Sequence, residues 1–393
     1  MVSNATSASF SLQNTQTLDE ARQSAESISD FSWSFWPRCH SNKSSPGLLC
    51  TFSDEKFAGG RGIFIVTSPD RAQEILKKTA FTQNAALNQI NDQKNPPFVQ
   101  QEFPGKGRGL IANKTIHRGD QIFAASALLI RNRDVYLLEE KYRLGIVQWG
   151  VETLPEKSKT LFWSLLDHFK GDPVDQRIST NAFQVYVNGA MYDAVIPEIA
   201  MLNHDCRPNA AYFWDEETLS HYVHATQTIH PGEEITITYI YNEKSRLERM
   251  DHLKAIWGFG CSCSTCSAHP FMADRSDERL QQISDLTSKI NDWSPQSEAT
   301  PEMAETLITL YQQERLFASL GVPYKYAAEA YASYGDRHNT IRYAGLSAEY
   351  TTLDKGFRDS DAEEMRAMAK NPELSWSWKK RMSPKGVRCT HSH

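Results

Sequence analysis

The stretch Asn203-His204-Asp205-Cys206-Arg207-Pro208-Asn209 decides the fold of this chain of 393 residues. It is followed by the segment Gly232-Glu233-Glu234-Ile235-Thr236-Ile237-Thr238-Tyr239, and then by a Cys-x-Cys-x-x-Cys cluster at residues 261–266. The heptad and the cluster together supply four thiols, which is the number that a closed tetrahedral zinc site requires. We therefore predict a Zn²⁺ site, and buried, unligated cysteines are the alternative. The predicted ligands are Cys206, Cys261, Cys263 and Cys266.

The composition is that of a globular protein with an acidic surface. The chain is 40% apolar and 11% aromatic, and its net charge is −6. A negative charge disfavours direct nucleic-acid binding, which uses clustered Lys and Arg, and it suits basic partners such as lysine-rich peptides. Seven cysteines, four of them in the metal-like group, disfavour a disulfide-bonded secreted protein. No apolar run is long enough for a signal or a membrane span, so we expect an intracellular protein, cytoplasmic or nuclear, of unknown oligomeric state.

Changes in composition and hydrophobic periodicity divide the chain into six segments. We expect a disordered leader at 1–30, a β-containing extension at 31–102, a mixed core at 103–242 with a helical insert at 131–180, a zinc segment at 243–268, a helical region at 269–375 and a basic tail at 376–393. Within the core, an apolar strand is expected at 121–130. The tail is either a nuclear import signal or a solvated end, and it contains Lys379, Lys380, Arg381, Lys385 and Arg388. Cys39 and Cys50 are either a second thiol pair or inert.

The heptad, the strand that ends at Tyr239 and the cysteine cluster, in this order, resemble the catalytic half of SET-domain methyltransferases. The resemblance covers Phe103 to Ala268, so that the core is a SET domain and the zinc segment a post-SET loop. It implies an α+β fold: a SET fold of short β-sheets with pseudoknot-like threading, a helical insert, and an all-α C-terminal region similar to TPR hairpins. The C-terminal helices resemble those of the MYND-associated, or SMYD, group. The zinc-finger residues of a MYND module are absent between 110 and 200, as in fungal-type SET proteins.

SET proteins move a methyl group from S-adenosyl-L-methionine to a lysine amine. The resemblance therefore implies a protein-lysine N-methyltransferase with S-adenosyl-L-methionine and Zn²⁺ as cofactors and a lysine-containing protein or peptide, histone or non-histone, as substrate. Two alternatives stay open. One is a catalytically weak SET-fold interaction protein that recruits a partner through its helical C-terminus, and the other is methylation of a small-molecule amine.

The cofactor needs groups for its amino-acid end and for its adenosine. The turn at 106–110 has two glycines that allow close backbone approach and two cationic side chains that can bind a carboxylate, although a tight hairpin is the alternative. The Asn-His pair of the heptad offers amide, imidazole and backbone groups. The resemblance adds an asparagine before a strand, and metal binding by the cysteine cluster would fold a phenylalanine over the adenine. The predicted cofactor-binding residues are Lys106, Arg108, Asn181, Asn203, His204 and Phe259.

Tyr239 resembles the tyrosine whose hydroxyl points at the transferring methyl and the target amine in SET proteins, and a plain core tyrosine is the alternative. The lysine must lose its proton, so its channel should be aromatic. The predicted channel residues are Phe183, Tyr241 and Trp257. Trp257 stands where the family pattern has a second tyrosine, which leaves the methylation state open.

Overall fold

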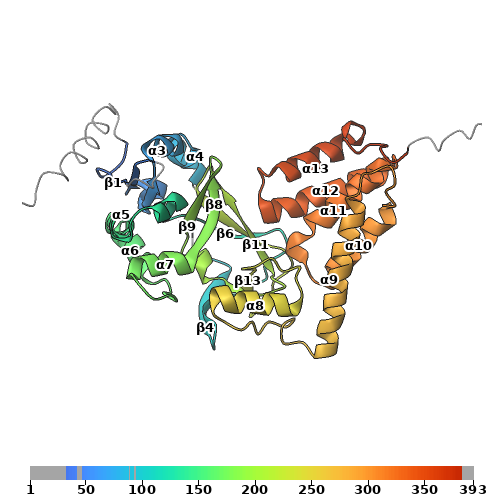
Figure 1. The fold of residues 1–393 in the computed structure, drawn as a ribbon, viewed down its shortest axis with the longest axis horizontal. Coiled ribbons are helices and arrows are strands. Elements are labelled where there is room, and N and C mark those ends of the chain that lie inside the picture. Colours follow the sequence, from blue (N-terminus) through green and yellow to red (C-terminus); the bar gives the residue numbers. More distant parts are fainter. Residues whose placement is uncertain (1–31, 42–46, 88, 93, 383–393) are drawn as a thin grey trace, which may run out of the picture. The chain divides into compact units, whose positions relative to one another are not determined.

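The computed structural model describes residues 32–41, 47–87, 89–92 and 94–382 (Figure 1). The chain forms two compact units, each built from two stretches of sequence. The first unit consists of Met1–Thr82 and Leu128–Val195, and the second of Gln83–Ala127 and Ile196–His393. The expected leader at 1–30 lies outside the described residues, as do Lys385 and Arg388 of the basic tail.

A six-stranded sheet organises the first unit. In spatial order its strands are β1 (Arg38–His40), β2 (Leu49–Asp54), β3 (Ile63–Thr67), β7 (Leu129–Asn132), β9 (Ala190–Val195) and β8 (Ala182–Val187). β3 and β7 pair in parallel, and all residues of β3 are buried, as its apolar sequence requires. Because this sheet joins the N-terminal extension to strands after residue 128, the two units cut across the segment boundaries expected from the sequence.

The helices of the first unit come from both of its sequence stretches. They are α2 (Phe57–Gly60), α3 (Pro69–Leu76), α4 (Thr79–Thr82), η2 (Arg133–Leu137), α5 (Glu140–Glu152), α6 (Glu156–Trp163) and α7 (Pro173–Asn181). The last four occupy the segment for which the sequence predicts a helical insert. α5 packs against β1, β2 and β3, and Gly150 lies directly on the Phe64 ring, where a Cβ would collide with it.

Cys39 and Cys50 face each other on β1 and β2 and form a disulfide. Their pairing was left open by the sequence, because a spacing of eleven residues does not specify a hairpin by itself. The register of the two strands supplies the missing information, since it places the two residues directly opposite.

Two smaller sheets belong to the second unit. One contains β10 (Asn203–His204), β13 (Glu234–Ile237), β5 (Gly107–Ala112) and β4 (Phe98–Phe103), and the other contains β11 (Ala210–Asp215), β12 (Ser220–Ala225) and β6 (Gln121–Ser126). Short 3-10 helices occur at η1 (Asn84–Leu87) and η3 (Ile199–Met201). β10 and β13 pair in parallel, so the heptad lies beside the strand that leads to Tyr239. The apolar run at 121–130, expected as one strand, is divided between β6 in this unit and β7 in the other.

The C-terminal part of the second unit is helical, as predicted, and its later helices lie side by side in Figure 1 (orange to red). Its elements are α8 (Arg246–Trp257), α9 (Pro270–Ile290), α10 (Pro301–Gln313), η4 (Phe317–Ser319), α11 (Gly321–Ser333), α12 (Arg337–Lys355), α13 (Ser360–Lys370) and η5 (Pro372–Leu374). Small residues let α11 and α12 approach closely, since Ala327, Ala328 and Ala344 are fully buried between helices. The likeness to TPR hairpins stays a prediction. None of the helices in the described ranges is long and apolar enough to cross a membrane.

Candidate functional site

The four predicted cysteine ligands converge on one point of the second unit. Their Sγ atoms all lie within 4.8 Å of one another, and Cys206 Sγ is 3.6 Å from that of Cys266 and 4.0 Å from that of Cys261. Thiolates placed ~2.3 Å from a Zn²⁺ ion at tetrahedral corners are roughly 3.8 Å apart. All four side chains are buried. The donor set and its spacing therefore fit a tetrahedral metal ion.

A buried cation lies beside the cysteine cluster. Arg249, on α8, is 1% exposed, and its guanidinium interacts with Cys206 and Cys266. Its Nε has no hydrogen-bond partner among the described residues. Four thiolates around Zn²⁺ carry a net charge of about −2, and a buried positive charge next to them offsets part of the cost of burying it. The arginine is thus suited to a metal-bound thiolate cluster.

His204 connects the cysteine cluster to Tyr239. Its Nδ1 accepts the backbone N–H of Tyr239 at 3.0 Å, so the proton of the neutral ring is on Nε2, which lies 3.4 Å from Cys206 Sγ. Burial lowers the pKa of His204 to about 4, which keeps the ring neutral near pH 7. Donors of this kind orient the ligands of a metal. Both ring nitrogens of this predicted cofactor-binding residue are therefore engaged by the protein.

Tyr239 lines a cavity of about 430 Å³ within the second unit. Its hydroxyl donates to the Leu202 carbonyl at 2.6 Å, and burial raises its pKa, so the phenol stays protonated. Its ring centroid is 5.4 Å from that of His204 and 5.9 Å from that of Trp257. Tyr241 lines the same cavity and is 64% exposed. The fold thus brings the predicted catalytic residue together with two of the three predicted channel residues.

A carboxylate joins two of the predicted cofactor-binding residues. Glu234 Oε2 pairs with Lys106 Nζ at 2.9 Å, and its Oε1 accepts a hydrogen bond from Asn203 Nδ2 at 2.8 Å. The Asn203 amide also lies against Gly109, where a Cβ would be 2.6 Å from Nδ2. Only glycine permits this approach. The glycine turn and the first residue of the heptad therefore form one polar site.

Phe259 and Arg108 have different surroundings. Phe259 packs, partly buried, against the cysteine cluster, with its ring centroid 6.3 Å from that of His204. Arg108 lies on β5 with its backbone opposite Glu102 of β4, two residues from the lysine of the polar site. The first residue is thus next to the heptad, and the second is on the strand that borders it.

Asn181 and Phe183 belong to the first unit. Asn181 ends α7, and its side-chain amide donates to the carbonyls of Leu166 and Arg177, at 2.8 and 2.7 Å. Phe183 lies on β8 and is partly buried. The Asn181 amide is therefore used in local hydrogen bonds at the point where α7 ends and β8 begins.

Sequence reasoning missed several polar residues of the second unit that border this site. They are Glu234, Arg249, Asp354 and the buried pair of Arg207 and Glu314, whose side chains are 1% and 2% exposed. For the helix that carries Arg249 the sequence does contain a signal, because the capping box formed by its N-cap serine and the glutamate three residues later is visible as Ser-x-x-Glu at 245–248. The other residues carry no local signal.

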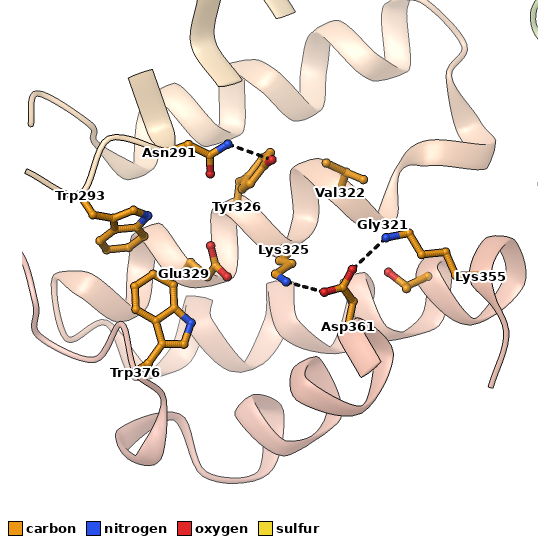
Figure 2. Close-up of a pocket in the computed structure, with 11 residues that line it drawn as sticks. Asn291, Trp293, Gly321, Val322, Lys325, Tyr326, Glu329, Lys355, Asp361 and Trp376 are labelled. Carbon is orange, nitrogen blue, oxygen red and sulfur yellow. Dashed lines mark hydrogen bonds and ion pairs between the residues drawn. The ribbon is translucent and has the colours of Figure 1, made fainter. Parts of the chain in front are cut away.

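A second cavity, of about 380 Å³, lies within the helical region (Figure 2). Glu329, 5% exposed, lies near Trp293 and Trp376 at one end, and at the other end Lys325 pairs with Asp361 at 2.7 Å. Burial raises the pKa of Glu329 to about 7. The lining contains two lysines and two acids, so its charge does not select the sign of a ligand.

Residues 107–240 match the family model for the SET domain. The match includes residues 107–110 of the glycine turn, the heptad and Tyr239, so this part of the chain is a SET domain. The resemblance on which the sequence prediction depends is thereby confirmed.

The chain is similar in sequence to proteins named as lysine methyltransferases. It is 32% identical over 191 residues to the histone-lysine N-methyltransferase set5 of Schizosaccharomyces pombe, which is 48% of this chain and 53% of that protein. It is 33% identical over 92 residues to the N-lysine methyltransferase SMYD2 of Bos taurus, which is 23% of this chain and 20% of that protein. The chain thus spans about half the length of the first relative and about a fifth of the second.

Proposed function

We propose that this protein transfers a methyl group from S-adenosyl-L-methionine to the ε-amine of a lysine in a protein, histone or non-histone. The observation that carries the proposal is the position of Tyr239, whose phenol lines a cavity while its backbone is held by His204 of the heptad. The SET-domain match and the names of the two relatives support the same reaction.

The reaction is a displacement at carbon. The lysine nitrogen uses its lone pair to bond the methyl carbon while the carbon–sulfur bond breaks, the sulfonium becomes a thioether, and the methylated ammonium later loses a proton to water. Aromatic surroundings and the positive sulfonium lower the lysine pKa from its usual value of about 10.4. The Tyr239 hydroxyl donates a hydrogen bond to the Leu202 carbonyl, which leaves its oxygen lone pairs for the amine N–H and the polarised methyl C–H groups.

The polar site around Glu234 is suited to the amino-acid end of the cofactor, which carries an ammonium and a carboxylate. Glu234 can take the ammonium, and Lys106 and Arg108 can take the carboxylate. Asn203 is oriented by its bond to Glu234 and offers its remaining amide hydrogen and oxygen. The site thus already contains a positive and a negative side chain in contact, Lys106 and Glu234, and each can bind the cofactor group of opposite charge.

The adenosine end has fewer side-chain donors. Because both ring nitrogens of His204 are engaged, we assign it a role through its backbone groups, and Phe259 offers a partly buried ring beside it. Asn181 as a cofactor contact and Phe183 as a channel residue stay proposals that depend on the SET resemblance.

We further propose that the cysteine cluster holds one Zn²⁺ with a structural role. The ion would connect the heptad to the segment after α8, and its binding energy would be folding energy. The proposed ligands are Cys206, Cys261, Cys263 and Cys266. The four buried thiols support an intracellular protein, while the Cys39–Cys50 disulfide is typical of an oxidising compartment. The acidic net charge supports a protein that does not bind nucleic acid directly.

The alternative of a catalytically weak interaction protein depended on Trp257. Its ring lies beside that of Tyr239, and Tyr239 still lines the cavity, so the described residues do not favour this alternative. A small-molecule acceptor has no supporting residue.

The test is a transfer assay with labelled S-adenosyl-L-methionine and a lysine peptide array, with free amines and Tyr239→Phe run alongside. We expect incorporation into a subset of peptides by the wild type, a large loss in the variant, and one zinc per chain by metal analysis. Absence of label in every peptide at full zinc content would reject the proposed reaction.

A further inference from the structure

The cavity beside Tyr239 is lined mainly by uncharged residues, with one acid and one histidine, His252, among them. One carboxylate, that of Asp354, lines it, and no lysine or arginine does. Asp354 lies near the end of α12, 115 residues after Tyr239, and the cavity is completed by residues of β11, α8 and η4. The helical region therefore contributes the charge of a cavity whose tyrosine belongs to the SET domain.

The Asp354 carboxylate has no hydrogen-bond or ion-pair partner in the part of the chain that the structure describes. The neighbouring Lys355 pairs instead with Asp361, at 2.8 Å. Two other polar groups of the cavity have partners, since the Tyr239 hydroxyl donates to a carbonyl and that of Tyr241 donates to a glutamate. Burial raises the pKa of Asp354 to about 6. A partly buried acid without a partner is costly, and a cationic ligand would remove that cost.

The end of α12 is fixed in place by contacts with β11. Gly356 has a φ of +103° and lies against Phe213, where a Cβ would be 2.6 Å from the ring. Two residues later Arg358 Nε pairs with Asp215 at 3.1 Å. The backbone that follows Asp354 is therefore fixed against β11 by contacts that do not involve the Asp354 side chain, and a change of that side chain need not move the helix end.

Tyr212 lines the same cavity as Asp354 and Tyr239. Beyond the effect of burial, the Asp354 charge raises the pKa of Tyr212, and Tyr212 in turn acts on Tyr239. A carboxylate next to the reacting nitrogen would hold it as an ammonium, which cannot attack the methyl group. The position of Asp354 suits a different cation of the same substrate.

We propose that Asp354 binds a cationic side chain near the target lysine, so that the protein selects lysines with a second basic residue close by in the substrate. This inference rests on the proposed function, because it takes a lysine peptide as the occupant of the cavity. Arginine is the best probe, since its planar guanidinium can make two hydrogen bonds to one carboxylate.

The experiment measures binding and transfer separately. Lysine peptides carry arginine, or glutamine as the matched neutral residue, at each of three positions on either side of the lysine. Affinity is measured by fluorescence anisotropy, and KM and kcat with labelled S-adenosyl-L-methionine. At the best position we expect the wild type to prefer arginine by about 10- to 100-fold in affinity and in KM, as for a hydrogen-bonded charge pair. Asp354→Asn should reduce this preference to near one without weakening the glutamine peptides.

Glu349→Gln is the matched control, because it removes a carboxylate from the same helix. The Glu349 carboxylate pairs with Arg118 and does not line the cavity. It should keep the wild-type preference. Asp354→Lys is tested with a third set of peptides that carry glutamate at the same positions, and it should prefer these over the arginine peptides, which a folding defect would not produce. The melting temperature of each variant is recorded.

An arginine preference that survives in Asp354→Asn overturns the inference, as does an equal loss on arginine and glutamine peptides, which would place Asp354 at the target lysine. If the arginine preference is found in binding but no peptide is methylated, only the proposed function fails. If peptides are methylated without any arginine preference, only the role of Asp354 fails.

Discussion

The buried pair of Arg207 and Glu314 makes the heptad depend on the helical region. Arg207 Nη2 is 2.7 Å from Glu314 Oε2, and Glu314 also accepts hydrogen bonds from Ser276 Oγ and Arg279 Nε, both at 2.6 Å. Arg207 Nη1 donates to the carbonyl of Cys206 at 2.9 Å. One carboxylate at the end of α10 therefore positions the residue next to a proposed zinc ligand.

Replacing Glu314 by alanine leaves the Arg207 guanidinium buried without a counter-charge. Removing one partner of a buried ion pair costs about 3–5 kcal/mol, which is a large part of the ~5–15 kcal/mol by which domains are stable. We expect the free energy of unfolding to fall by that amount. We also expect zinc to be lost to a chelator faster, because the Cys206 loop loses a constraint. Glu314→Gln keeps an acceptor and should fall in between.

The assay is urea unfolding followed by circular dichroism, with zinc release measured by a chromogenic chelator on the folded protein. Glu278→Ala is the matched control, since Glu278 pairs with Arg275 at 2.7 Å on the surface, with both side chains more than half exposed. Exposed pairs contribute about 1 kcal/mol at most. If Glu314→Ala costs no more than this control, the reasoning about the buried pair is wrong.

Three further predictions follow from single contacts. Cys263→Ser removes one of four thiolates, and we expect less than one zinc per chain and a loss of several kcal/mol in unfolding free energy; full zinc content would exclude Cys263 as a ligand. Gly109→Ala places a methyl 2.6 Å from Asn203 Nδ2, so calorimetry should show S-adenosyl-L-methionine binding weakened about tenfold, whereas Gly260→Ala, with open space around its Cβ, should bind normally. Burial raises the pKa of Glu329 from 4.5 to about 7, so the unfolded state ionises first and unfolding free energy should drop by about 3 kcal/mol as pH rises through this window. Glu329→Gln should remove that part of the drop between pH 4.5 and 8, and an unchanged slope would contradict the assignment.

The features that sequence could predict are those written in a short stretch of chain. The thiols converge as expected. Three of them lie within six residues and the fourth lies in the heptad, so the prediction required only one long-range contact, that between the heptad and the cysteine cluster. The helical region is likewise readable from local periodicity. The boundaries of its individual helices are harder to predict. For example, α10 ends at Gln313 and Arg315 adopts a φ of +56°, which the helical composition of this stretch does not indicate.

The features that sequence could not predict depend on which distant segments pack together. The apolar run at 121–130 is buried at every position after Gln121, and nothing in it marks that the chain passes from one sheet to another after Ser126. Glu234 and Asp354 look like ordinary charged residues in the sequence. Only the packing of β13 on β5 and of α12 on β11 gives each of them its surroundings.

Asp354 and Glu329 are both acids whose pKa is raised by burial. Their surroundings differ, and this difference is the reason why we propose a role in substrate binding for Asp354 and not for Glu329. Glu329 lines a cavity that also contains Lys325, and the charge of that lysine opposes the shift. Asp354 lines a cavity without a lysine or arginine and shares it with Tyr239. Since an isolated buried acid destabilises the fold above its pKa, amide variants of both residues should be at least as stable as the wild type at pH 8. Only the variant at 354 should change which peptides are bound, because only there does the missing counter-charge face the cavity that the substrate is proposed to occupy.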